Sequence, residues 1–548
     1  QSLPAAAMAA SMSWRRLVYS VYTPAVNGVF TRITDRLFRA RDRRRGTSVL
    51  LLAPLLAGAA PLPHAVSRPT GSAGAQGTDG LCTHFRWMAD HAPVFRVPGS
   101  HVHVLRSPDQ FYQAMKARIK TAKRRVVMAS LYLGTGQLEQ DLAKVTCLEE
   151  ALQRHPQLKV SVLLDYTRGS RAGQINSRTA LLPLLRRFGT QLRVSLYHTP
   201  DLRGLLRLLV PQRFNETIGV QHIKVYLFDD SVIISGGSAN LSDSYFTNRQ
   251  DRYVLLENCS QVADFFSRLV EAVGDVSLQL QDDSVAMLDG MVHPYKGMNS
   301  SLCCDHRRPA AVLGGGAAAL TEVLEAAQAE DEELSDGEED TWVIPLVQMK
   351  PLGIRVDEQV TQGLLRAAGP DSTVFLTSGY FNLTQAYMRL VLGAGASYRI
   401  LTASPEVNGF FGAKGVAGAI PAAYTHIARQ FYEQVCRLGQ QERVRLHEYH
   451  RARWSFHAKG LWYYLRGQDR PCLTLIGSPN FGYRSVHRDL EAQIAIVTEN
   501  EELQSQLQEE QEGLYRRSTE VSSSTFQQPD RHVQLWVKLV TPLIKNFF

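Results

Sequence analysis

The chain contains an internal repeat, and no other feature of the sequence constrains its fold more strongly. Five short segments of the first half have a counterpart in the second half, in the same order: RRVVMASLYLG (124–134) and STVFLTSGYFN (372–382), KVSVLLDYT (159–167) and YRILTASPE (398–406), RVSLYH (193–198) and RLHEYH (445–450), His222-Ile223-Lys224 and His457-Ala458-Lys459, and GSAN (237–240) and GSPN (477–480). Matching segments in a common order indicate two copies of one structural unit.

Each copy alternates two kinds of pattern. Short apolar runs such as 124–134 are typical of strands, whereas 107–124 and 424–439 carry apolar residues at three- and four-residue spacing, as amphipathic helices do. This alternation predicts an α/β fold of two repeated lobes, each a mixed sheet flanked by helices. We expect the lobes at 80–297 and 342–548.

The segment between the lobes, 298–341, differs in composition from both of them. Residues 309–319 read PAAVLGGGAAA, and residues 330–340, EDEELSDGEED, hold eight acidic residues in eleven positions. A dense run of like charges normally stays solvated instead of joining a core. We therefore expect 298–341 to be a low-complexity acidic linker.

Net charge and cysteine usage limit the class of protein. The 548-residue chain carries a formal net charge of +8, which favours anionic partners such as phosphates, nucleic acid or an acidic lipid surface. Its seven cysteines include no C-x-x-C pair and no zinc-binding spacing. A scattered, odd-numbered set indicates reduced thiols and not a disulfide framework. We expect no metal and no cofactor.

The first 47 residues are rich in arginine and poor in acid, with nine arginines against two aspartates. This composition predicts a mitochondrial transit peptide, and a nucleic-acid-binding arm is the alternative. Residues 48–79 then form a leader or linker. Its apolar part, 48–62, has fifteen residues interrupted by Pro54, which is too short to span a bilayer comfortably. We expect a protein that is soluble or lies on a membrane.

The two H-x-K segments carry the candidate chemistry. His222 and Lys224 stand two residues apart at the start of an apolar run, so on a strand they share one face. The polar turn that follows, with Ser238 and Asn240, could bring donors close to an anion. One such segment could equally be an ordinary strand and turn, but a second copy with His457 weakens that interpretation. Two imidazoles permit a two-step substitution at phosphorus, in which one attacks and the other moves protons.

A duplicated H-x-K followed by G-S-x-N resembles the phospholipase D superfamily. The first copy fits H-x-K-x4-D with His222, Lys224 and Asp229, whereas Tyr464 stands in place of the aspartate in the second copy. The resemblance implies that both motifs share one active site at the lobe interface. Within the superfamily, the chain after residue 80 resembles enzymes that transfer a phosphatidyl group from CDP-diacylglycerol to glycerol 3-phosphate. Four segments carry this closer resemblance: RFNETIG (213–219), 240–253, 403–424 and 477–500.

The resemblance implies a role for each motif residue. The catalytic residues it implies are His222, Lys224, Asp229, His457 and Lys459. Those that would hold the substrate phosphate are Ser238, Asn240, Ser478 and Asn480. Asp251 and Glu491, each eleven residues beyond a motif asparagine, would orient the histidines, and which one serves which histidine is open. With Tyr464 in the second copy, we expect His222 to attack phosphorus and His457 to act as acid and base; a degenerate second copy is the alternative.

The implied activity is synthesis of phosphatidylglycerol phosphate and CMP through a phosphohistidine intermediate. The expected partners are CDP-diacylglycerol, glycerol 3-phosphate and the anionic surface of the inner mitochondrial membrane, without nucleic acid. A hydrolase of the phospholipase D type, a nuclease-like protein and a non-catalytic scaffold are the alternatives. Residues 201–214 are apolar and basic, and either lie on lipid as a short helix or pack as a loop. Residues 408–421 are either a flexible loop over the lipid substrate or a tight turn.

Overall fold

The computed structural model describes residues 80–142, 147–171, 175–202, 212–237, 239–281, 284–286, 321–325 and 339–547, all within one compact unit, residues 76–548. The expected transit peptide, the leader at 48–79, most of the acidic linker and Ser238 lie outside the described residues. Most of the segment 201–214 also lies outside them.

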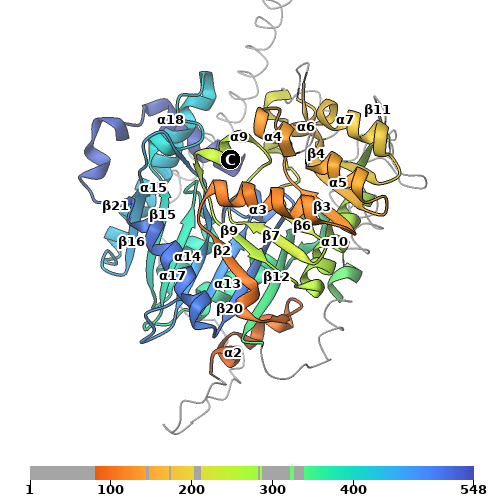
Figure 1. Cartoon of the computed structure of the whole chain (residues 1–548). Helices are drawn as coiled ribbons and strands as arrows, with labels where there is room; N and C mark the ends of the chain where they lie inside the picture. Colours follow the sequence, from red (N-terminus) through yellow and green to blue (C-terminus); the bar gives the residue numbers. More distant parts are fainter. Residues whose placement is uncertain are drawn as a thin grey trace, which may run out of the picture. The chain divides into compact units, whose positions relative to one another are not determined.

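The first repeat forms a nine-stranded mixed sheet (Figure 1). Its strands are, in spatial order, β11 (Ser284–Ala286), β10 (Leu278–Gln281), β5 (Leu192–Tyr197), β4 (Lys159–Asp165), β3 (Arg125–Ala129), β6 (Val225–Phe228), β7 (Ser231–Ser235), β9 (Tyr253–Leu256) and β2 (Val102–Leu105). The central strands β3, β4 and β5 are parallel, and the remaining pairs are antiparallel.

The second repeat forms a sheet of the same order. Its main strands are β1 (Phe95–Val97), β12 (Thr341–Met349), β20 (Glu491–Thr498), β19 (Leu473–Gly477), β18 (Lys459–Tyr464), β14 (Thr373–Ser378), β15 (Ser397–Ala403), β16 (Val444–Tyr449) and β21 (Ser518–Glu520), with β13 (Ile354–Arg355) paired to β12. From β12 to β21 each strand occupies the place of its counterpart from β2 to β10. The predicted α/β fold of two mixed sheets flanked by helices is confirmed.

Strand β1 departs from the repeat. It precedes the first sheet in the chain but pairs antiparallel with β12 of the second sheet, with Phe95 opposite Val343. The short helix α2 (Gly80–Phe85) also packs on the second repeat, where the ring of Phe85 meets Tyr463 edge-on. The start of the described chain therefore fastens the two repeats together.

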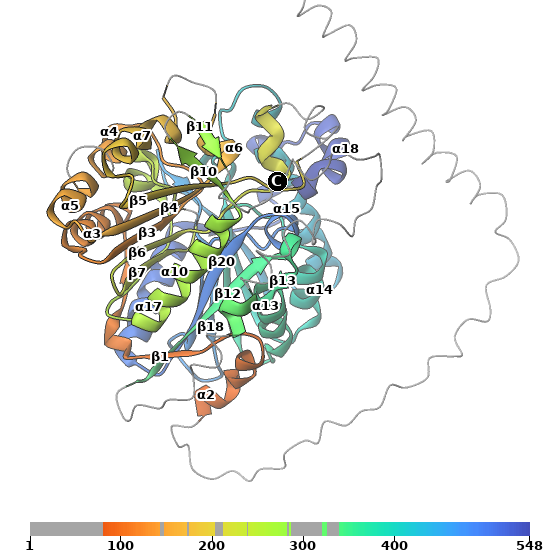
Figure 2. The same cartoon turned by 90° about the vertical axis from the view of Figure 1, so that its right-hand side faces the viewer.

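Both faces of the first sheet are buried, and each face packs on different helices. Val126 and Met128 belong to a core shared with α3 (Pro108–Thr121), α5 (Leu148–Arg154) and α7 (Ser177–Phe188). Val127 and Ala129 point the other way, into a core that contains α10 (Ser260–Asp275) and continues through the second repeat. Because both faces of the sheet are buried, the sequence of β3 is a nearly continuous run of apolar residues. Figure 2 shows β3 to β7 as a layer with α3 and α5 on its outer side.

The helices of the second repeat correspond in sequence order to those of the first. They are α13 (Val356–Ala367), α14 (Gln385–Gly393), α15 (Ile420–Arg437) and α17 (Glu501–Tyr515). Side-chain caps define several helix starts, as at α3, where Ser107 accepts a hydrogen bond from the backbone N–H of Gln110 at 3.1 Å.

One buried arginine joins the two repeats. Arg252, at the start of β9, is 1% exposed and lies 3.8 Å above the ring of Trp462 on β18. Its guanidinium donates to the carbonyl of Leu475 at 2.8 Å and to both carboxylate oxygens of Glu510 at 3.0 and 2.8 Å. Gly460 has a φ of +121°, and a side chain there would meet this guanidinium. The second repeat thus supplies nearly every partner of this cation.

We predict that Arg252→Met lowers the free energy of unfolding by ~3–5 kcal/mol, because it leaves the Glu510 carboxylate buried without its partner. Arg466→Met is the matched control, because Arg466 pairs with Asp371 at the surface, where such a pair contributes at most about 1 kcal/mol. Urea unfolding of both variants measures the difference. Equal losses of stability would contradict the role of Arg252.

Candidate active site

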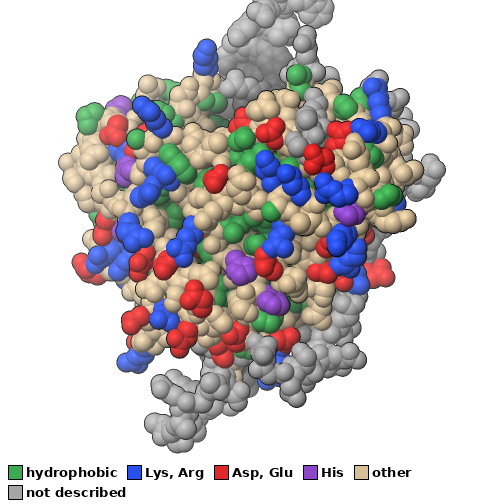
Figure 3. Space-filling model, in the orientation of Figure 1, with side chains coloured by type: hydrophobic (Ala, Val, Ile, Leu, Met, Phe, Trp, Pro, Cys, Tyr) green, Lys and Arg blue, Asp and Glu red, His purple; other side chains and the backbone are tan. Residues whose placement is uncertain are grey.

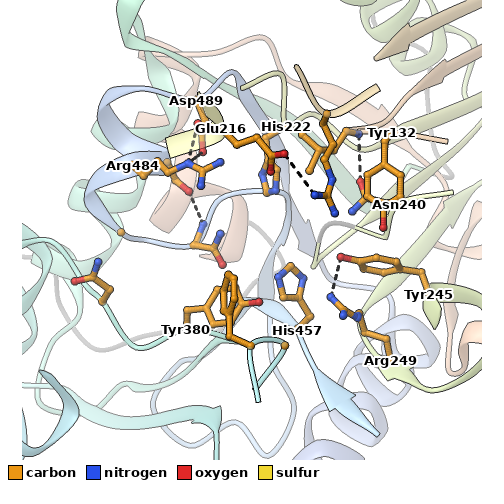
Figure 4. A pocket seen from close by; sticks show the side chains of 18 of the residues that line it. Tyr132, Glu216, His222, Asn240, Tyr245, Arg249, Tyr380, His457, Arg484 and Asp489 are labelled. Atoms are coloured by element: carbon orange, nitrogen blue, oxygen red, sulfur yellow. Dashed lines mark hydrogen bonds and ion pairs between the residues drawn. The ribbon is translucent and has the colours of Figure 1, made fainter. Parts of the chain in front are cut away.

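The backbone of each repeat positions the motif histidine of the other. The N–H of His222 donates to the carbonyl of Leu490 at 2.8 Å, just before β20. The N–H of His457 donates to the carbonyl of Gln250 at 2.9 Å, just before β9. Both imidazoles line one cavity between the repeats (Figure 4). The structure therefore brings the two motif histidines into one site.

His222 forms a buried hydrogen bond with a carboxylate of the second repeat. Its Nδ1 lies 2.8 Å from Oε2 of Glu491, and both side chains are buried. Burial, with the nearby ammonium groups of Lys224 and Lys459, holds the pKa of His222 well below its usual value. A neutral ring that donates from Nδ1 to the carboxylate keeps a lone pair on Nε2. The carboxylate serving His222 is therefore Glu491 of the other repeat.

His457 has a different partner. Its Nδ1 lies 3.0 Å from Nζ of Lys459, whose ammonium also donates to the carbonyl of Gly237. Burial and the charge of Lys459 hold the pKa of His457 well below its usual value. Burial lowers the pKa of Lys459 to about 7, so its side-chain nitrogen can donate to Nδ1 of His457 or accept from it. The two histidines thus have different partners, a carboxylate for His222 and an amine for His457.

Asp251 does not repeat the role of Glu491. Its Oδ1 accepts from the backbone N–H of Arg252 at 2.7 Å, and its buried Oδ2 has no hydrogen-bond partner among the described residues. Burial raises the pKa of Asp251 to about 7, although Lys459 acts in the opposite direction. Asp251 acts on His457 through the charge of Lys459 and not by a direct hydrogen bond.

The motif asparagines and Ser478 differ in position. Asn240 and Asn480 line the cavity. The side-chain oxygen of Asn240 accepts from the backbone N–H of Leu131 at 3.2 Å, and that of Asn480 has no partner within the described chain. Ser478 is fully buried behind the cavity wall, where its hydroxyl bonds to Ala492 and joins β19 to β20. Ser478 is thus placed to support the site and not to touch a substrate.

Asp229 lies at the far end of β6 from the histidines. It occupies the turn between β6 and β7 with a φ of +52° and does not line the cavity. Its carboxylate accepts from the backbone N–H groups of Lys123, Arg124 and Arg125 at 3.0, 2.8 and 3.0 Å. Partial burial raises the pKa of Asp229, but these three bonds outweigh that effect and lower it. The geometry places Asp229 away from the cavity, where its carboxylate fixes a turn.

Tyr464 replaces that turn residue in the second copy. Its hydroxyl donates to the side chain of Gln511 on α17 at 3.0 Å, and its ring packs on Phe375 with centroids 5.3 Å apart. The tyrosine anchors the strand end to a helix instead of to a turn. Its presence leaves the surroundings of His457 intact.

The cavity encloses about 290 Å³ and carries four arginines that no motif predicted: Arg168, Arg171, Arg249 and Arg484. Arg168 and Arg171 pair with Glu216, the former at 3.4 Å, and Arg484 pairs with Asp489 at 2.9 Å. These arginines could not be predicted from spacing, although Arg249 and Arg484 fall in segments that carried the closer resemblance.

Arg249 is the cavity cation without a carboxylate partner among the described residues. Its guanidinium lies 4.3 Å from the centre of the Tyr245 ring and donates to the hydroxyl of that tyrosine at 2.9 Å. Its Nε is buried without a hydrogen-bond partner within the described chain. A guanidinium that has neither a carboxylate nor a partner for its buried Nε is suited to an anionic ligand.

Aromatic side chains of the second repeat form the opposite wall. Tyr380 stacks on Tyr424 with centroids 5.1 Å apart, meets His457 edge-on at the same distance and contacts Phe410 at 5.7 Å. Phe410 belongs to the segment 408–421, so this segment contributes to the cavity wall. The cavity is therefore cationic on one side and apolar on the other.

The described chain has no group of three or more His, Cys, Asp and Glu side chains that could hold a metal ion. Cys147, Cys259, Cys436 and Cys472 are free thiols. No helix in the described ranges is long and apolar enough to cross a membrane.

Comparison with known proteins decides the family. No protein-family model matches the chain. A human protein named mitochondrial CDP-diacylglycerol–glycerol-3-phosphate 3-phosphatidyltransferase is 60% identical and aligns over 100% of both chains. A Saccharomyces cerevisiae protein of the same enzymatic name is 34% identical over 82% of this chain and 88% of its own. The chain belongs to the CDP-diacylglycerol–glycerol-3-phosphate 3-phosphatidyltransferases.

A solved structure shares the fold of this phosphatidyltransferase. The crystal structure of a phosphatidylserine synthase from Haemophilus influenzae superimposes with a TM-score of 0.63, covering 86% of this chain and 100% of that one at 19% identity. At this identity the likeness shows the fold alone.

We predict that Glu491→Gln lowers the kcat of this phosphatidyltransferase by about 10²–10⁴-fold, because an amide does not stabilise the His222 ring as a carboxylate does. Burial raises the pKa of Glu491 to about 7, so wild-type kcat should rise as the pH passes that value and the carboxylate ionises. The variant should show a smaller rise. The pH profile of kcat measures both effects.

Glu448→Gln is the matched control, because Glu448 is equally buried but pairs with Arg531 outside the cavity. This control should retain the wild-type pH profile. A Glu491→Gln variant with unchanged kcat would refute the pairing of the two repeats as a requirement for catalysis.

Proposed function

We propose that this chain transfers the phosphatidyl group of CDP-diacylglycerol to glycerol 3-phosphate in mitochondria, releasing CMP and forming phosphatidylglycerol phosphate. The observation that carries the proposal is the pair of buried histidines, one bonded to a carboxylate and one to an amine, at one cavity lined by arginines. The names of the relatives, at 60% and 34% identity, agree with this substrate pair.

In the first step, Nε2 of His222 attacks the phosphorus that bears the diacylglyceryl group. A P–N bond forms, the P–O bond to the CMP phosphate breaks, and CMP leaves with the electron pair. The leaving phosphate is a weak base, so CMP can depart as the dianion without taking a proton from the protein. Glu491 stabilises the His222 ring as positive charge develops on it.

In the second step, a hydroxyl of glycerol 3-phosphate attacks the phosphorus of the phosphatidyl-histidine. The neutral ring of His457 takes the hydroxyl proton at its unprotonated nitrogen, and the electron pair of the P–N bond returns to His222. His457 then passes that proton to water, so each histidine ends in its starting state and the cycle balances without an added base.

Cationic groups at the cavity support a reaction between two phosphate-bearing substrates. Arg249, which has no carboxylate partner in the described structure, is suited to the non-bridging oxygens of CDP-diacylglycerol. Arg168 and Arg171 share one carboxylate, Glu216, and are suited to the phosphate of the acceptor. A hydrolase would need no second phosphate site, so this excess of cations favours a transferase.

The nucleic-acid alternative receives less support. On the face of the molecule in Figure 3, lysines and arginines alternate with aspartates and glutamates instead of forming a basic stripe. A lipid substrate instead requires contact with a bilayer, so the enzyme is proposed to lie peripherally on the inner mitochondrial membrane. The mechanism uses no metal, and its assays can be run in excess EDTA.

We predict that His222→Ala forms no phosphatidyl-enzyme with radiolabelled CDP-diacylglycerol, because the attacking nitrogen is absent. His457→Ala should release CMP in a single turnover and then stall, because the acceptor hydroxyl lacks its base. Acid-quenched samples, separated and digested, locate the label. Label attached to His457, or an equal burst from His222→Ala, would reverse the two roles.

We predict that Arg249→Met lowers kcat/KM for CDP-diacylglycerol by about 10²–10³-fold, since it removes a buried cation from the phosphate site. Arg399→Met is the control: among the described residues Arg399 also has no carboxylate at hydrogen-bond distance, and its guanidinium donates to the backbone carbonyls of Tyr398 and Arg443. Steady-state assays at varied CDP-diacylglycerol compare the two. Equal kcat/KM values in both variants would exclude Arg249 from the phosphate site.

A further inference from the structure

The C-terminal helix α18 (Leu535–Ile544) turns its apolar side outward. Leu535, Leu539 and Leu543, spaced four residues apart on one stripe, are 71%, 67% and 53% exposed, and the adjacent Trp536 is 47% exposed. A surface helix of a soluble protein normally presents charged residues on this side. An exposed stripe of large apolar side chains marks an interaction surface.

The opposite side of α18 is fastened to the body of the protein. Val537 packs with Val533 and with Ala423 of α15, and Thr541 is buried. The helix is therefore held in place with its leucines exposed.

The end of α18 reaches the cavity wall. The carbonyl of Lys545, directly after the helix, accepts a hydrogen bond at 2.6 Å from Asn382, which lines the cavity. Two residues further, the ring of Phe547 lies 4.2 Å below the guanidinium of Arg488, next to α16 (Tyr483–His487). Figures 1 and 2 place α18 at the same end of the sheets as α6 (Tyr166–Gly169), which carries Arg168 of the cavity. The apolar stripe thus lies beside the site.

The charged residues of the C-terminal segment that contains α18 are all basic. Residues 532–548 include Lys538 and Lys545 and contain no aspartate or glutamate. Lysines beside an apolar stripe with a tryptophan match the amphipathic helices that lie in the interface of an anionic membrane. A tryptophan side chain is favoured at that depth.

We propose that the apolar stripe of α18 docks this enzyme on an anionic lipid bilayer and thereby holds the cavity at the membrane surface. The proposal rests on the proposed function, because a phosphatidyl substrate has its acyl chains in a bilayer. It differs from that function in naming the surface that meets the lipid. A bilayer fits better than a second copy of the chain, since facing α18 helices would bring their lysines together.

The test uses the full chain and assigns to Trp536 the difference in quenching between the wild type and Trp536→Phe, because the chain has five other tryptophans. Vesicles of phosphatidylcholine and phosphatidylglycerol, containing brominated phosphatidylcholine, should quench the fluorescence of the wild-type protein. They should quench Trp536→Phe less, because the reporter is missing. Neutral vesicles without phosphatidylglycerol should quench the wild type more weakly.

The variant Leu535→Ser/Leu539→Ser/Leu543→Ser keeps Trp536. Vesicles should quench the Trp536 fluorescence of this variant about threefold less, or more weakly still, than that of the wild type. Leu438→Ser is the matched control, because Leu438 is a leucine 53% exposed directly after α15. It should be quenched as the wild type is. Activity on detergent-dispersed CDP-diacylglycerol should be normal in both variants, which shows that they fold.

Unchanged quenching in the triple variant, or none in the wild type, would overturn the proposal whether or not the enzyme is active. Equal quenching by neutral and anionic vesicles would overturn the role of the lysines. A wild-type dimer that the triple variant converts to monomer, with vesicle quenching unaltered, would assign the stripe to a second copy instead. Normal vesicle binding by a chain without transferase activity would contradict the proposed function alone.

Discussion

The structure depends on one buried hydrogen bond between the repeats, from Nδ1 of His222 to the carboxylate of Glu491, 2.8 Å long. A buried carboxylate is unfavourable unless it has partners, and a buried imidazole needs a fixed tautomer to act as a nucleophile. The hydrogen bond gives one oxygen of Glu491 and Nδ1 of His222 a partner each. Because the two belong to different repeats, neither repeat holds a complete site. The buried guanidinium of Arg252, with its partners on the second repeat, keeps the two sheets in the register that this bond requires.

The repeats are alike in topology and unlike in chemistry. His222 faces a carboxylate, whereas His457 faces the ammonium of Lys459 at 3.0 Å. A symmetric pair of rings would compete for the same role. The different partners divide the work, because the carboxylate stabilises His222 as it becomes positively charged, and the amine leaves His457 neutral and able to take a proton. The repeats also differ outside the site. Where the first repeat has an aspartate that fixes a turn, the second has Tyr464, whose hydroxyl bonds to Gln511.

The fold of each repeat and the two motif histidines could be predicted from the sequence, because short local segments encode them. The repeated apolar segments predicted two mixed sheets, and the duplicated H-x-K pattern identified His222 and His457 as the candidate catalytic histidines. The rest depends on contacts between distant segments. No pattern shows that Glu491 reaches His222, that β1 joins the second sheet, or that Arg249 lies in the cavity without a carboxylate partner. The place of Asp229 in the motif also does not reveal that the four-residue strand β6 separates its side chain from the cavity.

The central claim is that two successive displacements occur at one phosphorus. Each in-line displacement inverts the configuration at phosphorus, so two of them restore it. The direct measurement is the stereochemical course of transfer from CDP-diacylglycerol made chiral by isotopic oxygen and sulfur at the phosphorus bearing the diacylglyceryl group. The account predicts net retention in the phosphatidylglycerol phosphate formed. Net inversion would mean that glycerol 3-phosphate attacks CDP-diacylglycerol directly, and it would contradict the covalent role of His222.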